Sequence, residues 1–574
     1  MNTKVLIFLL AVVFGSAFAA PPLPAPTLDT VNFIGAEILS RPTNHSVTVS
    51  VIPRVALVVR FEYGTDTTYG SLTPAETTVA DTPHFFVLGG LLPDLQYYYR
   101  MRYVVVANGE SLVGPGRTFH TQRPPGEKYV FDVEADPHML PAQGDTAPAF
   151  EQTLATLAAD KPDFLVDLGD NFMFDKWKTP APETILMRVL DYRQWWSEAC
   201  HSIPLFITLG NHEGEQGWDL DSTPTSTPVL FTNARKRYYW NPVPDGFYTG
   251  DTIPEQYVGL RQDYYAWNWG NVQFVVLDPY WHTMTKPHGL ETNWDWTLGR
   301  AQYDWLKQTL EQSSAKFKFV FIHHLVGGNI DSSARGGIEY AHFYEWGGLR
   351  SDSTWGFDSL RSGWGVPIHQ LLIDNHVDIL WHGHDHFFGK QDTDGIVYQE
   401  CPQPARARWE SLPNQAPKYG YKSGVIMGSR GYTRVTMDDT SAKVEYVRTF
   451  LPSETSAVHH NGDVAYSYTI VKHGSGGVDS PKSLPSPASI SVSPNPFRTR
   501  TAISLQLTAH SPARIAVYDA SGRLVRVLAS PRPLTPDPWS LIWDGRDQVG
   551  AIVPPGVYFV RAADGVRQQI VKVR

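Results

Sequence analysis

The sequence predicts a multidomain chain in which an α/β domain is flanked by an N-terminal and a C-terminal all-β sandwich. Three observations lead to this fold class. The 574 residues exceed what a single hydrophobic core usually supports. Near both ends, short runs alternate apolar and polar residues between Gly and Pro, as antiparallel sheets do. In the middle, apolar strands alternate with helical segments, which is the pattern of an α/β fold.

The first residues, MNTKVLIFLLAVVFGSAFA, predict a signal peptide over 1–19. An apolar run is followed by small residues at Ala17 and Ala19, and it is short for a membrane span of about 20 residues. No later stretch is long and apolar enough to span a membrane after signal removal. Export permits a disulfide between Cys200 and Cys401, the only two cysteines, but two free buried thiols fit the sequence as well.

Residues 29–122 are predicted to form the first β-sandwich. Leu57, Val59 and Phe61 share one strand face, and a later run places Tyr97 and Tyr99 on another. The phrase LLPDLQY, which ends at Tyr97, resembles the fibronectin type III pattern, in which a Tyr four residues after Pro forms a tyrosine corner. We expect this domain to brace its neighbour.

Residues 128–471 contain the predicted α/β domain. Its strands are YVFDVEAD, FLVDLGD, IPLFITLG, VQFVVLD, FKFVFIHH and VDILWHGH, and helical segments lie between them. Five short segments with metal-binding residue types follow strand ends, although the last is expected to begin inside its strand. They are DPH (136–138), GDN (169–171), GNHE (210–213), HH (323–324) and GHDH (383–386). Open α/β sheets place ligand sites at such strand ends.

The residue types of these segments predict a two-metal hydrolase. Imidazole nitrogens, carboxylates and an amide oxygen are ligands that divalent ions accept, and one carboxylate can bridge two ions. Two such ions can activate water and clamp a phosphoryl group. The formal charge of −10 and the absence of any Lys or Arg run argue against a nucleic-acid-binding patch, so metal ions would attract an anionic substrate.

Taken together, the five segments resemble the calcineurin-like metallophosphoesterase superfamily, which includes the purple acid phosphatases. The resemblance implies an αββα sandwich and two divalent or mixed-valence metal ions. It assigns Asp136, His138 and His386 to one ion, Asn211, His323 and His384 to the other, and Asp170 to both. It also implies that a metal-bridging hydroxide attacks phosphorus while Asn211 helps to stabilise the developing charge.

Two histidines have open roles. His212 is implied as the general acid for the leaving group or a stabiliser of its charge, and the alternative is a packing histidine. Of the pair at 323–324, the preceding apolar run favours His323 as the ligand. His324 then either contacts the phosphate of the substrate or simply lines the pocket.

One position departs from the purple acid phosphatases. They carry Tyr three residues after the bridging Asp, where this chain has Met173. Without that phenolate the protein is not expected to be purple, and Zn, Mn, Fe and Mg all suit the ligand set. Substrate selection is expected from two inserts, 278–296 and 324–348. Within these inserts a structural role is favoured over substrate contact for Trp281, His282, His342 and Glu345. No role is predicted for His382, His459 or His460.

Residues 472–486 read as a flexible Gly/Ser/Pro linker, and 487–574 as a second small β-sandwich. The motifs SPNPF, VYDASGR, WDGR and PGVYFVR resemble the C-terminal sorting domain of type IX secretion substrates. That resemblance implies the outer-membrane secretion machinery as a partner, and a protein that is secreted or attached to the bacterial cell surface. The alternative is a spacer or adhesion domain.

The sequence therefore predicts an exported metallophosphoesterase, similar to acid phosphatases, that hydrolyses small phosphate esters, with monoesters favoured. Two alternatives stay open. The same metal set serves phosphodiesterases and nucleotide hydrolases, and an inactive surface binding protein could use the same fold.

Overall fold

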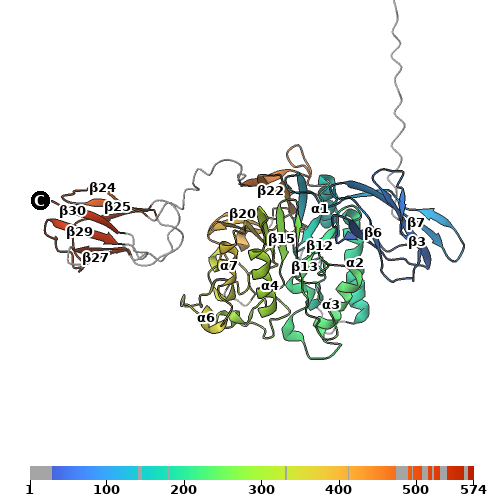
Figure 1. Cartoon of the computed structure of the whole chain (residues 1–574), viewed down its shortest axis with the longest axis horizontal. Coiled ribbons are helices and arrows are strands. Elements are labelled where there is room, and N and C mark those ends of the chain that lie inside the picture. Colours follow the sequence, from blue (N-terminus) through green and yellow to red (C-terminus); the bar gives the residue numbers. More distant parts are fainter. Residues whose placement is uncertain are drawn as a thin grey trace, which may run out of the picture.

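The computed structural model describes residues 29–139, 145–176, 181–329, 333–410, 413–472, 489–493, 495–506, 515–519, 523–529, 539–561 and 567–573 (Figure 1). The predicted signal peptide (1–19) lies outside these ranges, as does all of the predicted linker except Lys472. In the described part of the chain, no helix combines the length and the apolar character that a membrane crossing requires.

Two antiparallel sheets form the N-terminal sandwich. One contains β1 (Ile38–Ser40), β2 (Ser46–Val51) and β6 (His84–Gly89). The other contains β3 (Leu57–Gly64), β4 (Ser71–Leu72), β5 (Glu76–Thr77), β7 (Gln96–Val105), β8 (Ser111–Val113) and β9 (Arg117–His120). Leu57, Val59, Phe61 and Tyr99 are fully buried between the sheets. The Leu92 N–H donates to the Tyr97 hydroxyl at 2.8 Å, which is the type of bond that a tyrosine corner makes.

A buried arginine joins this sandwich to the next domain. Arg193 of α2 (Pro182–Cys200) donates to the Ser50 hydroxyl at 2.6 Å and to the Ala36 carbonyl at 3.2 Å. Phe85 stacks on Trp240, with ring centroids 3.8 Å apart. These contacts join the N-terminal sandwich to the domain that follows.

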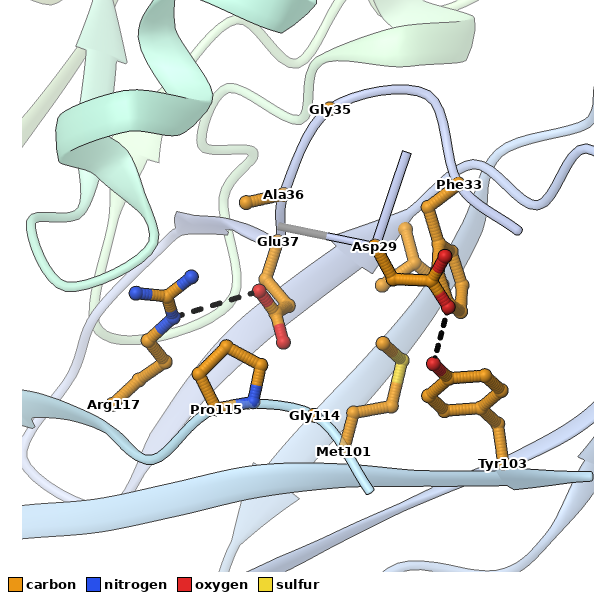
Figure 2. Close-up of a pocket in the computed structure, with 11 residues that line it drawn as sticks. Asp29, Phe33, Gly35, Ala36, Glu37, Met101, Tyr103, Gly114, Pro115 and Arg117 are labelled. Atoms are coloured by element: carbon orange, nitrogen blue, oxygen red, sulfur yellow. Dashed lines mark hydrogen bonds and ion pairs between the residues drawn. The ribbon is translucent and has the colours of Figure 1, made fainter. Parts of the chain in front are cut away.

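The N-terminal sandwich also has a small pocket of its own (Figure 2). Glu37 lies in it beside Arg117, whose Nε is 3.8 Å from a Glu37 carboxylate oxygen. Burial raises the pKa of Glu37, and Arg117 opposes the rise. Tyr103 donates a short hydrogen bond to Asp29 at the other end of the pocket. Tyr103 thus satisfies Asp29, whereas Glu37 Oε1 and Arg117 Nε are buried without a hydrogen bond to any described residue.

The central domain contains two mixed sheets packed face to face. The first has the order β12-β11-β10-β21-β22-β23 and the second β13-β14-β15-β16-β17-β19-β18-β20. Aromatic side chains from both sheets, including Phe131, Phe164, Phe274, Phe319 and Trp381, fill the layer between them. The strands are β10 (Tyr129–Glu134), β11 (Leu165–Asp167), β12 (Leu205–Ile207), β13 (Thr249–Gly250), β14 (Tyr265–Trp269), β15 (Val272–Val276), β16 (Phe317–Phe321), β17 (Ile379–His382), β18 (Phe388–Thr393), β19 (Ile396–Glu400), β20 (Val425–Met427), β21 (Gly431–Met437), β22 (Ser441–Arg448) and β23 (Val464–Val471).

Helices cover the outer faces of both sheets, so the layers are αββα. Helices α1 (Ala147–Asp160), α2 and α3 (Thr227–Tyr238) pack on the first sheet through residues such as Phe150, Trp196 and Phe231. Helices α4 (Arg300–Glu311) and α7 (Ile368–Asp374) pack on the second through Leu306 and Leu372. The insertions carry short elements: η2 (Phe174–Lys176), η3 (Asn211–Glu213), η4 (Gly217–Asp219), η5 (Leu290–Asp295), η6 (Ile338–Tyr340), α5 (Tyr344–Gly347), α6 (Phe357–Leu360) and η7 (Pro413–Gln415).

The last described strands form two further antiparallel sheets. One contains β24 (Ser489–Ser493), β25 (Thr501–Gln506) and β28 (Trp539–Trp543), and the other β26 (Ile515–Asp519), β27 (Leu524–Ala529), β29 (Gly556–Arg561) and β30 (Arg567–Lys572). Phe497, Val517, Trp543 and Val560 are buried in one shared core. The sequence left open whether Cys200 and Cys401 form a disulfide or are free buried thiols. In the described structure both are buried and not disulfide-bonded.

Candidate metal centre

Five loops converge at the carboxyl ends of the parallel strands. Strands β10, β11 and β12 run parallel to one another in the first sheet, and β15, β16 and β17 do so in the second. Asp136, Asp170 and Asn211 follow the first three strands, and His323 follows β16. Strand β17 ends at His382, so the last segment begins after its strand and not inside it, contrary to the expectation. That shift places His384 and His386 in the same kind of loop as the other candidates.

Several of these residues have strained backbones. Asp136, Asp170, His384 and His386 have φ values of 60°, 64°, 77° and 68°, in the left-handed region that side chains with a Cβ rarely adopt. Such conformations persist only where surrounding contacts enforce them, and they cluster at functional sites. The surrounding contacts therefore hold these loops in strained conformations, as is common at functional sites.

The side chains gather into two groups that share Asp170. Asp136, His138, Asp170 and His386 form one, and Asp170, His323 and His384 form the other, with the nitrogen and oxygen atoms of each group within 4.8 Å of one another. Asp170 Oδ2 lies 3.0 Å from His138 Nε2 and 3.2 Å from His323 Nε2. One carboxylate oxygen therefore stands between the two sets of ligands, which is the position a bridging ligand needs.

Hydrogen bonds fix which nitrogen each imidazole presents. His323 Nδ1 lies 2.8 Å from the Leu168 carbonyl, so it carries the proton and Nε2 faces the site. His384 is reversed, because its Nε2 donates to the Ser333 carbonyl at 2.5 Å and its Nδ1 faces His323 at 3.2 Å. Metal-binding histidines are commonly oriented in this way by a donor bond from the other nitrogen.

The residues fit divalent metal ions, and the fit rests on buried acceptors that lack partners. Asn211 Oδ1, Asp136 Oδ1 and His386 Nε2 are buried and make no hydrogen bond to any described residue. A buried polar atom without a hydrogen bond costs roughly 1–3 kcal/mol, and two of the three, Asp136 Oδ1 and His386 Nε2, lie 3.5 Å apart, so a ligand between them is called for. Divalent cations bind oxygen and imidazole nitrogen atoms, so one ion at Asp136 and His386 and another at Asn211 would satisfy these atoms.

The charges of the site are mutually dependent. Burial lowers the pKa of His138, but Asp136 and Asp170 outweigh it and raise that pKa to about 10. In the same way Asp170 and Asp136 raise the pKa of His323 to about 9 against burial. Burial and then His138 lower the pKa of His386 to about 4. Without metal, the two carboxylates are thus neutralised by two protonated histidines, which a pair of cations would replace.

His212 stands beside the shared carboxylate. Its Nε2 is 3.7 Å from Asp170 Oδ2, and its Nδ1 is 2.6 Å from Asp175 Oδ1 in η2. Its ring meets the His138 ring edge to face at 4.9 Å. Asp175 orients the imidazole so that Nε2 points to the site. The sequence did not identify Asp175, because nothing in its local pattern distinguishes it from a surface carboxylate.

Two buried glutamates hold the loops and were also missed as functional residues. Glu213 accepts backbone N–H bonds from Gly210, Asp170, Asn171 and Phe172. Glu400 accepts from the N–H groups of Asp385 and His386 at 3.0 and 3.1 Å. Glu213 was visible inside GNHE, but only the fold shows that its partners belong to another loop.

His324 lies beside the site against two aromatic rings. Its ring is 4.6 Å from Trp296 and 5.1 Å from Tyr280, and its Nδ1 is 2.9 Å from the Leu325 carbonyl. Burial and then His323 lower its pKa to about 3, so the imidazole is neutral. His324 Nε2 and the Tyr280 hydroxyl are buried without a hydrogen bond in the described structure. Tyr280, in the first predicted insert, is a buried neighbour of the site that the sequence did not single out.

The other singled-out side chains lie elsewhere. Glu345 is buried against Arg361, and Trp281 stacks under the Arg261 guanidinium at 5.3 Å. Burial and then Arg261 lower the pKa of His282 to about 4. His382 pairs with Glu400 at 2.8 Å, and His459 stacks on Phe450. His342 belongs to a separate cluster, described below. Met173 is fully buried in the loop after Asp170.

Comparison with known proteins agrees with this geometry. Residues 130–388 match the model of the calcineurin-like phosphoesterase family, so the chain contains a calcineurin-like metallophosphoesterase domain. No curated protein matches the chain in sequence.

Two solved structures share the fold. The structure of PhoD is 16% identical with a TM-score of 0.55, covering 78% of this chain and 92% of PhoD. The purple acid phosphatase PPD1 from yellow lupin (Lupinus luteus) seeds is 14% identical with a TM-score of 0.50, covering 76% of this chain and 74% of its own. At these identities the similarity is one of fold, and it extends beyond the phosphoesterase domain.

Proposed function

We propose that this protein is a dinuclear metal-dependent phosphoesterase that favours phosphate monoesters. The observation that carries the proposal is the pair of ligand groups that share Asp170. Asp136, His138 and His386 would hold one ion, and His323, His384 and Asn211 the other. When bound, two divalent ions would supply a nucleophile from water and neutralise the charge of the phosphate.

The side chains around the ions would do the remaining work. Asn211, an amide ligand on the family resemblance, would help to hold an equatorial phosphate oxygen. His212, oriented by the Asp175 carboxylate 2.6 Å from its Nδ1, would deliver a proton from Nε2 to the leaving oxygen. The neutral His324, between Tyr280 and Trp296, would form a wall of the substrate pocket. Because its Nδ1 donates to the Leu325 carbonyl, its Nε2 would be an acceptor there.

The decisive experiment measures bound metal and hydrolysis together. The metal-loaded full chain is expected to hydrolyse p-nitrophenyl phosphate faster than bis-p-nitrophenyl phosphate. Asp170→Ala should lose bound metal and at least about 10³-fold of the activity, because one substitution removes a ligand from both ions. Absence of hydrolysis by metal-replete protein, as expected of an inactive binding protein, or undiminished hydrolysis by Asp170→Ala, would sink the proposal. Faster diester hydrolysis would overturn the monoester preference alone.

The role of His212 has its own test. His212→Asn should retain metal and lose more activity on an alkyl phosphate than on p-nitrophenyl phosphate, because a poor leaving group depends more on the proton. Equal losses on both substrates would show that His212 only packs against His138.

We also propose that the enzyme is exported and works outside the cytoplasm or on the cell surface. The support is in the sequence: the signal-peptide pattern at 1–19, and the resemblance of 487–574 to type IX sorting domains, which leaves the outer-membrane machinery as the partner. The fibronectin type III-like domain would serve as a brace through Arg193. Deleting 487–574 should trap active enzyme in the periplasm, and unchanged secretion of the truncated chain would refute the sorting role.

A further inference from the structure

Three residues outside the proposed active site form a second concentration of metal-ligand types. His342 follows η6 in the second insert, His369 lies in the first turn of α7, and Asp394 lies in the turn between β18 and β19. Their ligand atoms lie within 4.8 Å of one another. None belongs to the five segments, and they come from three elements that are far apart in the sequence.

The distances suit one ion. Asp394 Oδ2 is 2.9 Å from His369 Nε2 and 3.7 Å from His342 Nε2. Ligands about 2.0–2.1 Å from a tetrahedral zinc ion stand about 3.3 Å from each other, midway between these two values. Small side-chain movements therefore bring all three atoms into a coordination sphere.

The residues behind His369 orient it for this role. Tyr398 Oη lies 2.7 Å from His369 Nδ1 and accepts the Trp346 indole N–H at 2.9 Å. If His369 Nε2 binds an ion, its Nδ1–H donates to the same tyrosine oxygen, which has a second lone pair for it. This is the outer hydrogen bond that fixes the tautomer of a metal-binding histidine. Thr393 donates to Asp394 Oδ2 at 3.2 Å and holds the carboxylate in place.

Burial gives the cluster a closed side and an open side. The side chains of His369 and Asp394 are 3% and 6% exposed, whereas that of His342 is 41% exposed. An ion would thus be held by two buried ligands and one at the surface, and its fourth position would face water. Three protein ligands with two imidazoles favour zinc over magnesium or calcium, which prefer all-oxygen sites.

The cluster also connects to the active-site loop. Upstream of His342 in the same insert, Arg335 Nη1 donates to Asp385 at 3.2 Å and the Gly336 N–H donates to Asp385 at 2.8 Å. Asp385 lies between the ligand candidates His384 and His386. An ion on His342 would fix the far end of a segment whose near end touches the GHDH loop.

We propose that His342, His369 and Asp394 form a third metal site, selective for a zinc-like ion, that fastens the second insert to α7 and the β18–β19 turn. The site is structural, and its ion is separate from the two ions of the active site. It braces the rim of the pocket and does not contact the substrate.

The test is metal stoichiometry in saturating zinc. After chelation and equilibrium dialysis, the full-length protein is expected to bind about one equivalent more zinc than His342→Gln or Asp394→Asn. Either variant should keep the hydrolytic activity of the zinc-loaded protein within a few-fold, because neither residue touches the dinuclear centre. His376→Gln, which changes an exposed histidine just after α7, is the matched control and should bind as the unmodified protein does.

A second readout separates metal binding from packing. Added zinc should raise the melting temperature of the Asp170→Ala protein, whose dinuclear centre is impaired, and should not raise that of Asp170→Ala/His342→Gln to the same extent. Equal zinc content in the full-length protein and both single variants would overturn the proposal and leave a hydrogen-bonded His–Asp–His cluster. Loss of an equivalent in His376→Gln as well would also overturn it, because the lost site would then lie elsewhere. The inference stands apart from the phosphoesterase proposal, since zinc content is measured without any substrate.

Discussion

Replacing Glu213 by Gln tests how the loops of the metal centre are held. Each carboxylate oxygen of Glu213 accepts two backbone N–H groups: Oε1 from Asn171 and Phe172, and Oε2 from Asp170 and Gly210. Gln retains one acceptor oxygen and turns an NH₂ group toward the other two donors. Two buried N–H groups thereby lose a charged acceptor, at a cost of about 1.5–3 kcal/mol each, or about 3–6 kcal/mol together.

The charge that Gln removes offsets part of this cost. Burial and then Asp170 raise the pKa of Glu213 to about 7, from 4.5 in the unfolded chain. A carboxyl group with a raised pKa destabilises the fold increasingly from about pH 4.5 up to pH 7, by roughly 1.4 kcal/mol per unit and about 3 kcal/mol in total. Metal-free wild-type protein should therefore lose up to about 3 kcal/mol of unfolding free energy between pH 4.5 and 7 that Glu213→Gln does not lose, so the substitution should cost more stability at pH 5 than at pH 8.

Metal affinity distinguishes this role from ordinary packing. Asp170 and Asn211 sit on the two loops that Glu213 joins, so Glu213→Gln should weaken zinc binding at least about tenfold, as loss of outer partners does. Asp163→Asn is the control, because Asp163 accepts from Arg123 and Trp269 before β11, at the other end of that strand from the site. It should lose stability and keep its zinc affinity. Stability is measured by urea unfolding and zinc affinity by competition with a chelator. If Glu213→Gln and Asp163→Asn lose similar stability and both keep their zinc affinity, Glu213 does not hold the metal-binding loops.

Three other predictions concern different parts of the chain. Burial and then Arg117 lower the pKa of His201 to about 4, so the unfolded chain binds a proton below about pH 6.5 that the folded state does not. The free energy of unfolding should therefore fall by up to about 3 kcal/mol between pH 6.5 and 4. In urea unfolding, His201→Asn should reduce this pH dependence. Arg193→Met should lower the free energy of unfolding in urea by about 2 kcal/mol, because Ser50 and the Ala36 carbonyl lose their buried donor. The loss is partly offset because the charge, whose burial lowers the pKa of Arg193 to about 10, is no longer buried. An unchanged urea midpoint would argue against the bracing role. Iron-loaded protein should lack a visible tyrosinate band because Met173 replaces the phenolate; if a band is present and Tyr280→Phe abolishes it, the phenolate comes from Tyr280 instead.

The clustering of the candidate metal ligands could be predicted from the sequence because one physical rule places these residues. Each candidate follows an apolar strand, and the ends of parallel strands meet at one edge of a sheet. The order of the strands in each sheet did not have to be known for this inference. The same reasoning failed for the start of the last segment, since residues such as Trp381 and His382 extend the apolar pattern without showing where β17 stops.

The residues that hold the centre obey no such rule. Glu213, Glu400 and Asp175 accept hydrogen bonds from loops or rings that lie elsewhere in the chain, and a carboxylate in the sequence does not reveal its donor. Arg193 is similar, because an arginine in an amphipathic helix reads as a surface residue until a second domain covers it. These contacts depend on how elements pack, so only the folded structure identifies them.

The cluster around His342 extends this distinction to sites as a whole. In the sequence His342 lies in an insert without a motif, where a structural role is favoured over substrate contact. Its partners come from the start of a helix and from a hairpin turn in which Asp394 adopts a φ of 52°, so no spacing along the chain predicts the group. In an open α/β sheet, ligand sites lie at the carboxyl ends of the strands. A structural ion is not restricted to those ends and can lie wherever two segments of the chain meet. If zinc binds here, further ions in related chains should be sought where inserts meet the domain surface and not among the motifs.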